Sequence, residues 1–583
     1  MQSTFVAHVR HQVGAYGSTR SYTYLREAGR ELIEDISTFS DLDRDARALA
    51  DWLSRREEAD RPVMLLYPPG PEFLRAFLGC LYAGVIAVPA PAPHDARSVR
   101  RVLGIFDDAG VRLVLTTSEL RESLTASIRE YEGPASSISV AATDGEPLGD
   151  PAAWVMPDIS GDTVAFLQYT SGSTGDPKGV VVSHGNLMHN EAAIAAATAA
   201  DDASIGVGWL PHFHDMGLIG MLLQPLFVGG SLVYMSPMTF LKRPVRLLEA
   251  IDRYGAHITA APNFAYELMV RRVTDAQLAQ LDLSSLRVAL SGAEPIRART
   301  LDAVIERLGP AGFRADAFVA GYGMAETTLI ATASPVGRPT VHLDADPAAL
   351  ERGRVIPAGS GTRLVGCGAT VAGLDIRIVD PVTLRTLPDG HVGEIWIAGT
   401  SVAQGYWGRG EETRGSFAAH TEGVGPYLRS GDLGAHHAGD LYVTGRLKDL
   451  IILNGRNLYP QDIEEAVRGI HPALADAEGV VLSIEADGQE RLLVIQGVRT
   501  NAWGGLNPAE LAARIRTTVA RGFEVPAPSV VLVERRAVHR TTSGKVQRAS
   551  MRAAFLDRTI RAVLHEEIEP AVERMRTPVP VLV

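Results

Sequence analysis

Short apolar runs alternate with amphipathic segments through the first part of the chain. Residues 41–56 (DLDRDARALADWLSRR) have helical spacing, whereas 63–67 (VMLLY) and 111–117 (VRLVLTT) are short apolar runs. Residues 76–88 (AFLGCLYAGVIAV) form the longest apolar stretch and end at Pro89. This stretch is too short to span a bilayer, so we expect a buried helix that runs into a strand.

The same alternation continues further along the chain. Residues 164–170 (VAFLQYT) predict a strand that enters a glycine-rich loop, and 184–200 (HGNLMHNEAAIAAATAA) predict a helix. More segments with a strand followed by a loop lie at 231–235, 257–262, 286–292 and 317–323. Strands that alternate with helices indicate an open, mostly parallel sheet, so the predicted fold class is α/β.

The pattern changes after about residue 335. A loop-rich stretch is followed there by short strands at 374–380 (LDIRIVD) and 394–399 (EIWIAG). We expect a large N-terminal domain and a hinged, smaller C-terminal α+β domain, with bounds 1–445 (its part from about 336 to 445 being a small β-rich subdomain) and 446–583. Near the end of the chain, residues 552–575 predict an amphipathic helix that packs on the C-terminal domain.

Composition and charge exclude several classes of protein. The 583 residues are 46% hydrophobic and 21% charged, as in an ordinary globular protein. A net charge of −12 argues against a general nucleic-acid binder. Cys80 and Cys367 are too few for a disulfide framework or a cysteine zinc site. The first residues lack the apolar core of a signal peptide, so we expect a cytoplasmic enzyme without stable membrane insertion.

Lysine is rare in this chain. Lysine and arginine total 56 residues, yet only four of them are lysines. Lys178, Lys448 and Lys545 lie in segments with glycine and serine, where a compact, flexible ammonium group differs in use from a planar guanidinium. Chance is the alternative for so few residues, but each segment also has other features of an anion-binding site.

The segment 169–179 (YTSGSTGDPKG) follows a predicted strand. Its glycines let backbone amides turn toward an anion, its hydroxyl groups supply further donors, and Lys178 adds a mobile positive charge. The spacing does not match a Walker loop. A flexible surface turn is the alternative, but the density of donors beside a lysine favours phosphate binding.

Two further segments have the composition of a nucleotide site. In 320–328 (AGYGMAETT), Tyr322 could stack on a flat base and Glu326 could hold Mg²⁺ through oxygen. A core tyrosine and a solvated glutamate are the alternative. Asp432 and Arg446 lie at predicted strand edges, where a carboxylate could accept hydrogen bonds from ribose hydroxyls. A structural salt bridge fits their spacing equally well.

The segment 540–548 (RTTSGKVQR) places Lys545 on a Ser/Gly turn of the C-terminal domain. A lysine in that position can reach a cleft of another domain and stabilise the charge that develops on a phosphate. An exposed turn lysine is the alternative.

The four motifs, in this order, closely resemble those of the adenylate-forming superfamily, which contains acyl-CoA synthetases, adenylation domains and firefly-type luciferases. The resemblance covers nearly the whole chain. Three segments are most similar to the fatty acyl-AMP ligase branch: 209–220, 445–464 and the long stretch between Thr328 and Asp375. The resemblance implies that an insertion in this last stretch restrains the C-terminal domain and disfavours release to coenzyme A.

The resemblance also implies a role for each motif. The triphosphate would be held by Thr170, Ser171, Gly172, Ser173, Thr174, Gly175 and Lys178. The adenosine would be walled by Gly292, Ala293, Glu294, Tyr322, Gly323, Met324 and Ala325, with Asp432 and Arg446 on the ribose. Glu326 would bind Mg²⁺, Lys448 would be the hinge and Lys545 the catalytic lysine. Two positions depart from many relatives, since Asp176 replaces a neutral or basic residue and Lys448 often corresponds to Asp.

Residues 205–241 are almost entirely apolar. Asp215 is their only acidic or basic side chain apart from histidines. Such a stretch can line a tunnel for an alkyl chain, and ordinary core packing is the alternative for most of its residues. The candidate lining residues are Trp209, Met216, Gly217 and Ile219.

Two histidines in this stretch are candidates for chemistry. We expect His214 to lie beside the substrate carboxylate. His212, His214 and Asp215 superficially resemble zinc ligands, although no further ligand cluster is evident.

These inferences predict an enzyme that uses ATP and Mg²⁺ to convert a fatty acid into acyl-AMP and pyrophosphate. The acyl group would then pass to the phosphopantetheine arm of an acyl carrier protein, in lipid, polyketide or lipopeptide biosynthesis. Because the chain ends soon after Lys545, we expect the carrier to be a separate protein or part of an adjacent synthase. Two alternatives stay open: a fatty acyl-CoA synthetase, and a non-catalytic module that binds nucleotide or acyl chains.

Overall fold

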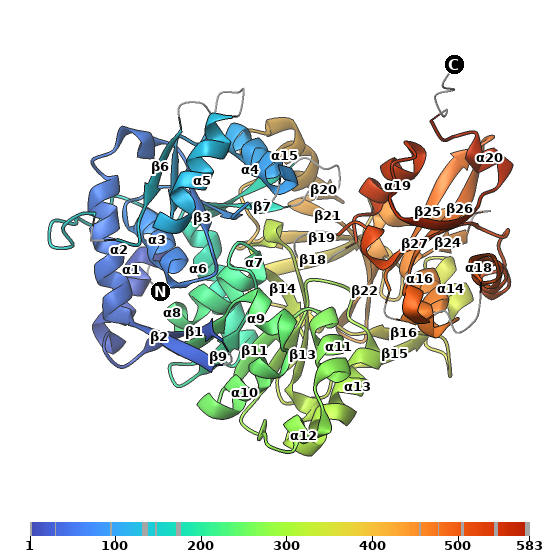
Figure 1. Ribbon diagram of the computed structural model, residues 1–583, viewed down its shortest axis with the longest axis horizontal. Helices are drawn as coiled ribbons and strands as arrows, with labels where there is room; N and C mark the ends of the chain where they lie inside the picture. The colour runs from blue at the N-terminus through green and yellow to red at the C-terminus, as the bar shows by residue number, and fades with distance from the viewer. Residues whose placement is uncertain are drawn as a thin grey trace.

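The computed structural model describes most of the chain. The described residues are 3–29, 31–93, 96–130, 138–145, 148–170, 177–453, 456–475, 477–502, 507–540 and 546–577. Figure 1 shows a large body on one side and a smaller C-terminal part on the other.

One sheet of the body contains six strands. In spatial order these are β6 (Ser139–Ala142), β5 (Leu113–Thr116), β3 (Val63–Tyr67), β4 (Ala87–Pro91), β7 (Val164–Thr170) and β8 (Lys178–Ser183). All neighbours are parallel except β7 and β8, which are antiparallel. Helix α2 (Phe39–Leu53) precedes β3, and α3 (Pro71–Tyr82), α4 (Ala96–Ala109) and α5 (Ser118–Arg129) connect β3, β4, β5 and β6 in turn.

The prediction for residues 76–88 is confirmed. Helix α3 ends at Tyr82, and β4 begins at Ala87 within the six-stranded sheet. Both elements are almost entirely buried, which explains why this stretch has no polar face.

The second sheet of the body contains nine strands. In spatial order these are β17 (Ala369–Thr370), β14 (Ile330–Ala333), β13 (Phe318–Gly323), β12 (Val288–Ser291), β11 (Ile258–Ala261), β9 (Ile205–Gly208), β10 (Ser231–Met235), β1 (Ser21–Ala28) and β2 (Glu31–Thr38). The strands from β13 to β1 are parallel, as the sequence predicts, and antiparallel strands close both edges.

Helices on this sheet complete the body. They are α1 (Phe5–Tyr16), α6 (His184–Thr198), α7 (Asp215–Gly217), the π-helix η3 (Leu218–Leu223), α8 (Gln224–Val228), α9 (Pro237–Lys242), α10 (Val245–Tyr254), α11 (Asn263–Arg272), α12 (Asp275–Leu278) and α13 (Ala298–Leu308). Helix α6 begins at a capping box in which the Ser183 hydroxyl accepts a hydrogen bond from the Asn186 N–H at 3.1 Å. One continuous hydrophobic core connects both sheets.

The expected β-rich subdomain is an antiparallel sheet of five strands. They are β18 (Leu374–Val379), β19 (Gly393–Gly399), β20 (Ala419–Thr421), β21 (Val424–His437) and β22 (Asp440–Arg446), with α15 (Gly410–Phe417) beside them. The stretch identified as a ligase-type insertion contains a small hairpin of β15 (His342–Ala345) and β16 (Thr362–Val365), separated by α14 (Pro347–Glu351).

The C-terminal part has its own sheet and its own apolar clusters. After the hairpin of β23 (Ile451–Leu453) and β24 (Arg456–Leu458), it contains α16 (Pro460–Arg468), α17 (Pro472–Ala475), β25 (Gly479–Ala486), β26 (Gln489–Val498), α18 (Pro508–Gly522), β27 (Ser529–Glu534), α19 (Arg548–Leu556), β28 (Val563–Glu567) and α20 (Pro570–Glu573). The domain boundary predicted after residue 445 falls at the end of β22.

The prediction of one helix over residues 552–575 is wrong. Helix α19 ends at Leu556, and residues 563–567 form β28, which pairs antiparallel with β27 at the edge of the C-terminal sheet. Val563 and His565 are in register with strand residues of β27, so backbone pairing in the sheet replaces the helical pattern of the isolated sequence.

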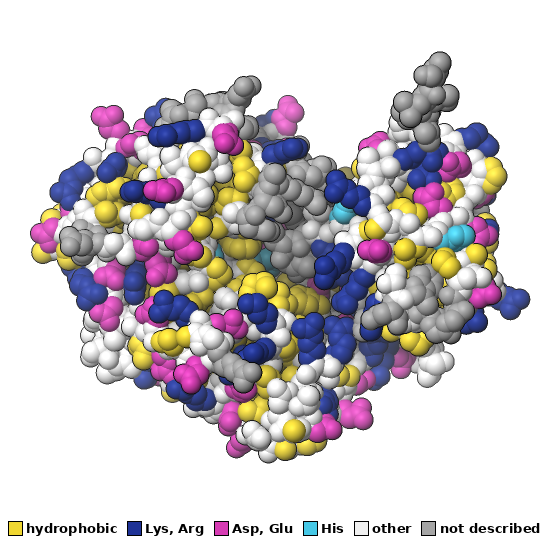
Figure 2. Space-filling view, viewed as in Figure 1, with side chains coloured by type: hydrophobic (Ala, Val, Ile, Leu, Met, Phe, Trp, Pro, Cys, Tyr) yellow, Lys and Arg dark blue, Asp and Glu magenta, His cyan; other side chains and the backbone are white. Residues whose placement is uncertain are grey.

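The body and the C-terminal part meet around a hollow. Figure 2 shows apolar side chains on the floor of this hollow and basic side chains along its lower rim. Ion pairs connect the parts. Glu465 of α16 contacts Arg299 of the body at 2.8 Å and Arg297 at 3.9 Å, and Glu351 of the insertion contacts Arg456 of β24 at 2.7 Å. Among the described residues, no helix is long and apolar enough to cross a bilayer.

Candidate active site

One cavity of about 1160 Å³ lies where the two sheets of the body, the β-rich subdomain and the C-terminal part meet. Its walls come from the ends of β7, β12 and β13, from β21 and the end of β22, and from β25 and α19. The carboxyl ends of parallel strands in an open α/β sheet are the usual place for a ligand site. The cavity therefore unites motifs that lie far apart in the sequence.

The phosphate-loop prediction is partly within the described residues. Thr170 ends β7 and lines the cavity, whereas Ser171, Gly172, Ser173, Thr174 and Gly175 lie outside the described residues. Lys178 begins β8 and also lines the cavity. Its ammonium group forms an ion pair with Glu412 of α15 and lies 5.3 Å from the centre of the Tyr406 ring.

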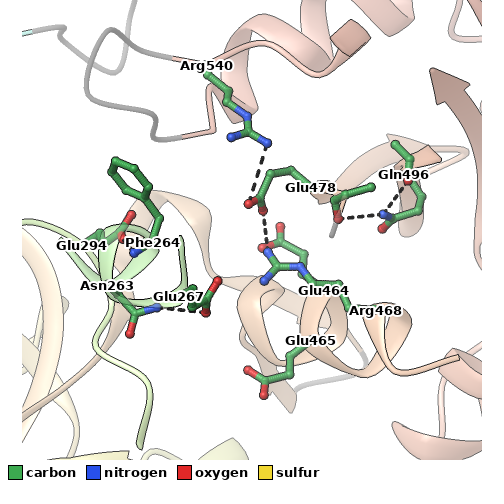
Figure 3. Close-up of polar contacts among 12 residues, drawn as sticks. Asn263, Phe264, Glu267, Glu294, Glu464, Glu465, Arg468, Glu478, Gln496 and Arg540 are labelled. Atoms are coloured by element: carbon green, nitrogen blue, oxygen red, sulfur yellow. Dashed lines mark hydrogen bonds and ion pairs between the residues drawn. The ribbon is translucent and has the colours of Figure 1, made fainter. Parts of the chain in front are cut away.

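Gly292, Ala293 and the segment from Tyr322 to Glu326 line the cavity next to each other. Their strands β12 and β13 are parallel neighbours, so both segments leave the sheet at the same edge. A Cβ atom on Gly323 would lie 1.8 Å from the Leu329 carbonyl oxygen, so this position requires glycine. Glu294 does not line the cavity, because its Oε1 turns away to accept a hydrogen bond from the Phe264 N–H at 2.6 Å (Figure 3).

Asp432 and Arg446 are brought together by the pairing of β21 with β22. They are directly opposite in register, and Arg446 Nε lies 3.0 Å from Asp432 Oδ1. The hydroxyl of Tyr322 donates to Asp432 Oδ2 at 2.9 Å. The attraction of Asp432 raises the pKa of Arg446, and burial raises the pKa of Tyr322. The salt bridge that the sequence left open is therefore present, and all three groups line the cavity.

Glu394 is a cavity residue that sequence reasoning missed. It is 2% exposed on β19 and accepts hydrogen bonds from Trp396 Nε1 at 2.9 Å, Arg429 Nε at 2.9 Å and the Gly431 N–H at 3.2 Å. Gly431 has a φ of +72°, next to Asp432. The signal available in the sequence was a glutamate in an apolar predicted strand. In the structure, the hydrogen bonds of Glu394 fix the bend of β21 that presents Asp432.

Glu326 is half-buried at the cavity wall. Burial raises its pKa, whereas the Tyr406 hydroxyl, which donates to Glu326 Oε1 at 2.9 Å, favours the charged form. The described residues contain no cluster of three or more His, Cys, Asp or Glu side chains that could hold a metal alone. Mg²⁺ is commonly bound by one or two carboxylates together with substrate phosphates, so a single carboxylate beside a phosphate loop fits this ion.

The two histidines have different environments. His212 is 4% exposed and packs on Phe73 with 4.1 Å between ring centres, and burial lowers its pKa to about 3. His214 lines the cavity, and its Nδ1 lies 2.7 Å from Asp215 Oδ1. Because His212 faces the core and the described residues contain no metal cluster, the structure gives no support to the zinc alternative. His214 lines the cavity, and its expected position beside a substrate carboxylate stays a prediction.

Of the four residues predicted to line an acyl pocket, only Met216 lines the cavity. Trp209 stacks on Phe240 with 4.0 Å between ring centres, and Ile219 is fully buried. A Cβ atom on Gly217 would lie 2.1 Å from the Pro211 carbonyl oxygen, so this glycine permits close packing of the backbone. An apolar run identifies a buried segment, but it does not show which side chains face a cavity.

The apolar lining comes mostly from other elements. Sequence reasoning missed Ile194 and Thr198 of α6, Ile258 and Ala260 of β11, and Leu290 of β12. Gly220, Met221 and Gln224 of η3 and α8 lie within the stretch 205–241 that was expected to line a tunnel, but they were not singled out. No local signal separates these residues from ordinary core. They form one surface because distant segments pack together.

Helix α6 is fixed to the loop that carries Glu326. Asn190 is fully buried, and its side-chain amide donates to the carbonyls of Thr327 at 3.1 Å and Ile330 at 2.9 Å. The Ile330 N–H in turn donates to Asn190 Oδ1 at 3.1 Å. These three bonds hold the apolar and polar sides of the cavity in one arrangement.

The C-terminal part closes the cavity. Lys448 lies in η7 (Leu447–Asp449) and lines it, and burial lowers the pKa of its ammonium group. Leu482 of β25 and Arg548 of α19 also face the cavity. Lys545 lies outside the described residues, and Val546, which follows it, lines the cavity.

A family model described as "AMP-binding enzyme" matches residues 17–407. The chain belongs to the AMP-binding enzyme family. A second model, described as "Disco-interacting protein 2-like, AMP domain", matches residues 448–565 of this AMP-binding enzyme.

Two curated relatives and one solved structure are similar over nearly the whole length. The chain is 40% identical to medium-chain-fatty-acid–[acyl-carrier-protein] ligase JamA of Moorena producens, covering 96% of both chains. It is 34% identical to long-chain-fatty-acid–AMP ligase FadD32 of Mycolicibacterium smegmatis, covering 96% of this chain and 95% of the relative. The crystal structure of a fatty acyl-adenylate ligase from L. pneumophila with acyl adenylate and pyrophosphate is 34% identical, with a TM-score of 0.73 and coverage of 97% and 98%.

The ion pair between Lys178 and Glu412 is expected to affect the KM for ATP of this AMP-binding enzyme. Glu412 would compete with a phosphate that binds Lys178, and hydrogen bonding to Lys178 and Arg409 lowers the pKa of Glu412. Exposed ion pairs are worth about 0.2–1 kcal/mol, so Glu412→Gln should lower the KM for ATP by about two- to fivefold with little change in kcat. Pyrophosphate release at varied ATP measures both constants.

A neighbouring glutamate provides the control for this experiment. Glu411 is exposed, so Glu411→Gln should leave the KM for ATP unchanged. An unchanged or higher KM in Glu412→Gln would show that Glu412 does not compete with the nucleotide.

The contact between α16 and the body is expected to depend on pH. Burial and the neighbouring Glu465 and Glu464 raise the pKa of Asp462 to about 7, against the opposing effect of Arg297. Figure 3 shows Glu464 and Glu465 on α16. Glu465 pairs with Arg299 of the body at 2.8 Å, whereas Glu464 is buried against Arg548 of the C-terminal part at 2.6 Å.

Because the pKa of Asp462 is raised in the folded protein, stability is expected to decrease as the pH rises. Asp462 keeps its proton in the folded protein between about pH 4 and 7, so its contribution to stability is lost as the pH rises through that range. Asp462→Asn should flatten this part of the pH profile, by about 2 °C in the unfolding midpoint between pH 5 and pH 8. Asp557→Asn, at an exposed aspartate, should keep the wild-type slope, and an equal slope in both variants would contradict the assignment.

Proposed function

We propose that this protein is a fatty acyl-AMP ligase. It activates a fatty acid with ATP to acyl-AMP and pyrophosphate, and then transfers the acyl group to the phosphopantetheine arm of an acyl carrier protein. The observation that carries the proposal is one continuous cavity, polar around Lys178, Asp432 and Arg446 and apolar from Met216 to Ile258. Relatives named as ligases of fatty acids to AMP or to a carrier protein support it.

In the first step, a carboxylate oxygen of the fatty acid forms a bond to the α-phosphorus of ATP. The bond from that phosphorus to the bridging oxygen of the β-phosphate breaks, and pyrophosphate leaves. Two anions must meet, so the barrier is largely electrostatic and positional. Lys545 is assigned to the space between the carboxylate and the α-phosphate, Lys178 to the leaving phosphates and His214 to the carboxylate.

The nucleoside is assigned to the groups around β13 and β21. Asp432 accepts hydrogen bonds from the ribose hydroxyls while Arg446 and Tyr322 hold the carboxylate in place. The adenine lies against Gly292, Ala293 and the Tyr322 segment, where glycine backbone leaves room for a flat base.

Glu326 is assigned to Mg²⁺. Bound there with the phosphates of ATP, the ion would neutralise negative charge on the phosphates. Glu326 must be ionised to act as a ligand, and the hydrogen bond from Tyr406 favours that form against the effect of burial.

In the second step, the sulfur of the phosphopantetheine thiol forms a bond to the acyl carbonyl carbon. The thiol proton is released, the bond from that carbon to the phosphate oxygen breaks, and AMP leaves. Transfer to a carrier rather than to coenzyme A is supported by the contact of the insertion with the C-terminal part, since Arg456 Nε also donates to Glu351 Oε2 at 2.8 Å. The proposal includes a cytoplasmic location, because the reaction consumes ATP.

Product analysis tests the proposal. The protein is incubated with ATP, Mg²⁺ and a panel of fatty acids, without acceptor, with coenzyme A and with a phosphopantetheinylated carrier protein, and the products are identified by mass spectrometry. We expect acyl-AMP in every case and acyl-carrier in the last. Abundant acyl-CoA would favour an acyl-CoA synthetase, and absence of pyrophosphate release with every acid would favour a non-catalytic binding module.

A further inference from the structure

The apolar end of the cavity is a channel along one face of the nine-stranded sheet. Ile258 and Ala260 of β11 are two residues apart and therefore point to the same face. Ala260 is in register with Leu290 of β12, and all three residues line the cavity. Gly292, two residues beyond Leu290, continues this row to the nucleotide end.

The opposite wall is formed by α6, η3 and α8. Ile194 and Thr198 are four residues apart on α6 and share one face of that helix. Gly220, Met221 and Gln224 follow along η3 into α8, and α6 contacts both of these elements (Figure 1). A π-helical turn is rare and is found frequently at functional sites.

Gly208 of β9 allows η3 to approach the sheet. A Cβ atom on Gly208 would lie 2.7 Å from the Met221 methyl group, so this methyl group occupies space that a larger residue would fill. Met221 is 2% exposed and lines the cavity.

Gln224 joins the two helices of this wall. With its amide oriented to satisfy both groups, its oxygen accepts from the Ala195 N–H at 3.2 Å and its nitrogen donates to the Glu191 carbonyl at 3.2 Å. Helix α8 is thus joined to the backbone of α6. Burial raises the pKa of Glu191 well above its usual value.

The register of the strands gives the depth of the channel. Ile258 is level with Val288, and Gly292 lies four residues further along the chain, so the two levels are about 13 Å apart at about 3.3 Å per residue. Three bonds of an extended chain advance about 3.6 Å, so this depth holds about ten to eleven bonds. Thr198, which lines the cavity from α6, is buried.

We infer that the enzyme selects medium-chain fatty acids of about eight to twelve carbons, because Ile258 ends the channel at that depth. The inference rests on the proposed function. The names of the relatives do not decide the length of the fatty acid, since one relative is a medium-chain and another a long-chain ligase. The structure adds the residues that set the limit.

A series of saturated acids tests the limit. Butyrate, hexanoate, octanoate, decanoate, laurate, myristate and palmitate are each supplied with ATP and Mg²⁺, and pyrophosphate release gives kcat/KM. We expect a maximum near decanoate and a loss of at least about tenfold at palmitate, since one methylene too many in a closed pocket already costs ten- to two-hundredfold. Palmitate used as well as decanoate would overturn the inference. Failure of every acid would instead reject the proposed function.

Substitutions at the middle and the end of the channel should move the limit in opposite directions. Ala260→Leu should lower kcat/KM for decanoate by at least about tenfold while hexanoate stays within about threefold of wild type. Ile258→Ala should raise the ratio of myristate to decanoate by about tenfold, because it lengthens the channel. Unaltered chain-length profiles in both folded variants would contradict the assignment of the channel.

Val288→Ala is the matched control for these variants. Val288 is level with Ile258 on the adjacent strand and is 1% exposed, but it does not line the cavity. It should lower stability without moving the preferred chain length. Thermal unfolding and ATP binding show that each variant is folded, and Ile258→Ala keeps the test decisive if Ala260→Leu does not fold.

Discussion

Lys545→Ala is expected to lower the rate of acyl-AMP formation by about a hundred- to a thousandfold, the usual loss when one preorganised charge contact to a transition state is removed. Val546, Gln547 and Arg548 line the cavity directly after this lysine, although Lys545 itself lies outside the described residues. Binding of ATP should change little, because Lys178 and Asp432 remain. Pyrophosphate exchange measures the rate, and nucleotide titration measures the affinity.

Lys242→Ala is the matched control for this variant. Lys242 is the only one of the four lysines outside the glycine- and serine-containing motifs, and its ammonium group lies 3.5 Å from Glu27 on the surface. It should retain wild-type rates. Pyrophosphate exchange at the normal rate in Lys545→Ala would remove the catalytic assignment and with it the expected role of the C-terminal part.

Asp432→Ala is expected to raise the KM for ATP by about a hundredfold, because two hydrogen bonds to a charged group are lost at about 1.5–3 kcal/mol each before compensation by water. Asp432 is 6% exposed and is held by both Arg446 and Tyr322. The variant should also lose the preference for ATP over 2′-deoxy-ATP, which a general loss of structure would not produce. Initial rates with both nucleotides give this ratio.

Asp375→Ala provides a control with similar chemistry in another place. Asp375 accepts a hydrogen bond from the Tyr427 hydroxyl at 2.6 Å and pairs with Arg377 at 3.1 Å, but it does not line the cavity. Its KM for ATP should equal that of the wild type. If Asp432→Ala keeps full discrimination between the two nucleotides, the ribose is bound by other groups.

The local sequence pattern predicted the elements whose own residues are apolar enough to indicate burial. The apolar stretch 76–88 gave α3 and β4, and the strand at 164–170 is β7. Tertiary pairing overruled the pattern at 552–575, where a helical spacing ends in β28. A strand at a sheet edge is stabilised by its neighbour, which the pattern of one segment does not contain.

The same distinction holds for the candidate site. The polar members were predictable because each lies in a short motif: Thr170 and Tyr322 near the ends of their strands, and Asp432 within β21 next to Gly431. The sequence also assigned to the cavity four residues from such segments whose side chains or backbones face elsewhere: Glu294, Trp209, Gly217 and Ile219. Proximity in sequence places a residue near a site, but the local backbone direction decides which way it points.

The amino-acid sequence by itself determined the family of folds, the order of the motifs and the polar groups that a nucleotide would meet, because strand periodicity and glycine-rich ends are local properties. Only the tertiary structure decided the apolar channel. Ile194, Met221, Ile258 and Leu290 come from four elements and look like ordinary core in the sequence. Their common surface exists because α6 and η3 pack on one face of the sheet, and that contact depends on how distant parts of the chain fold together.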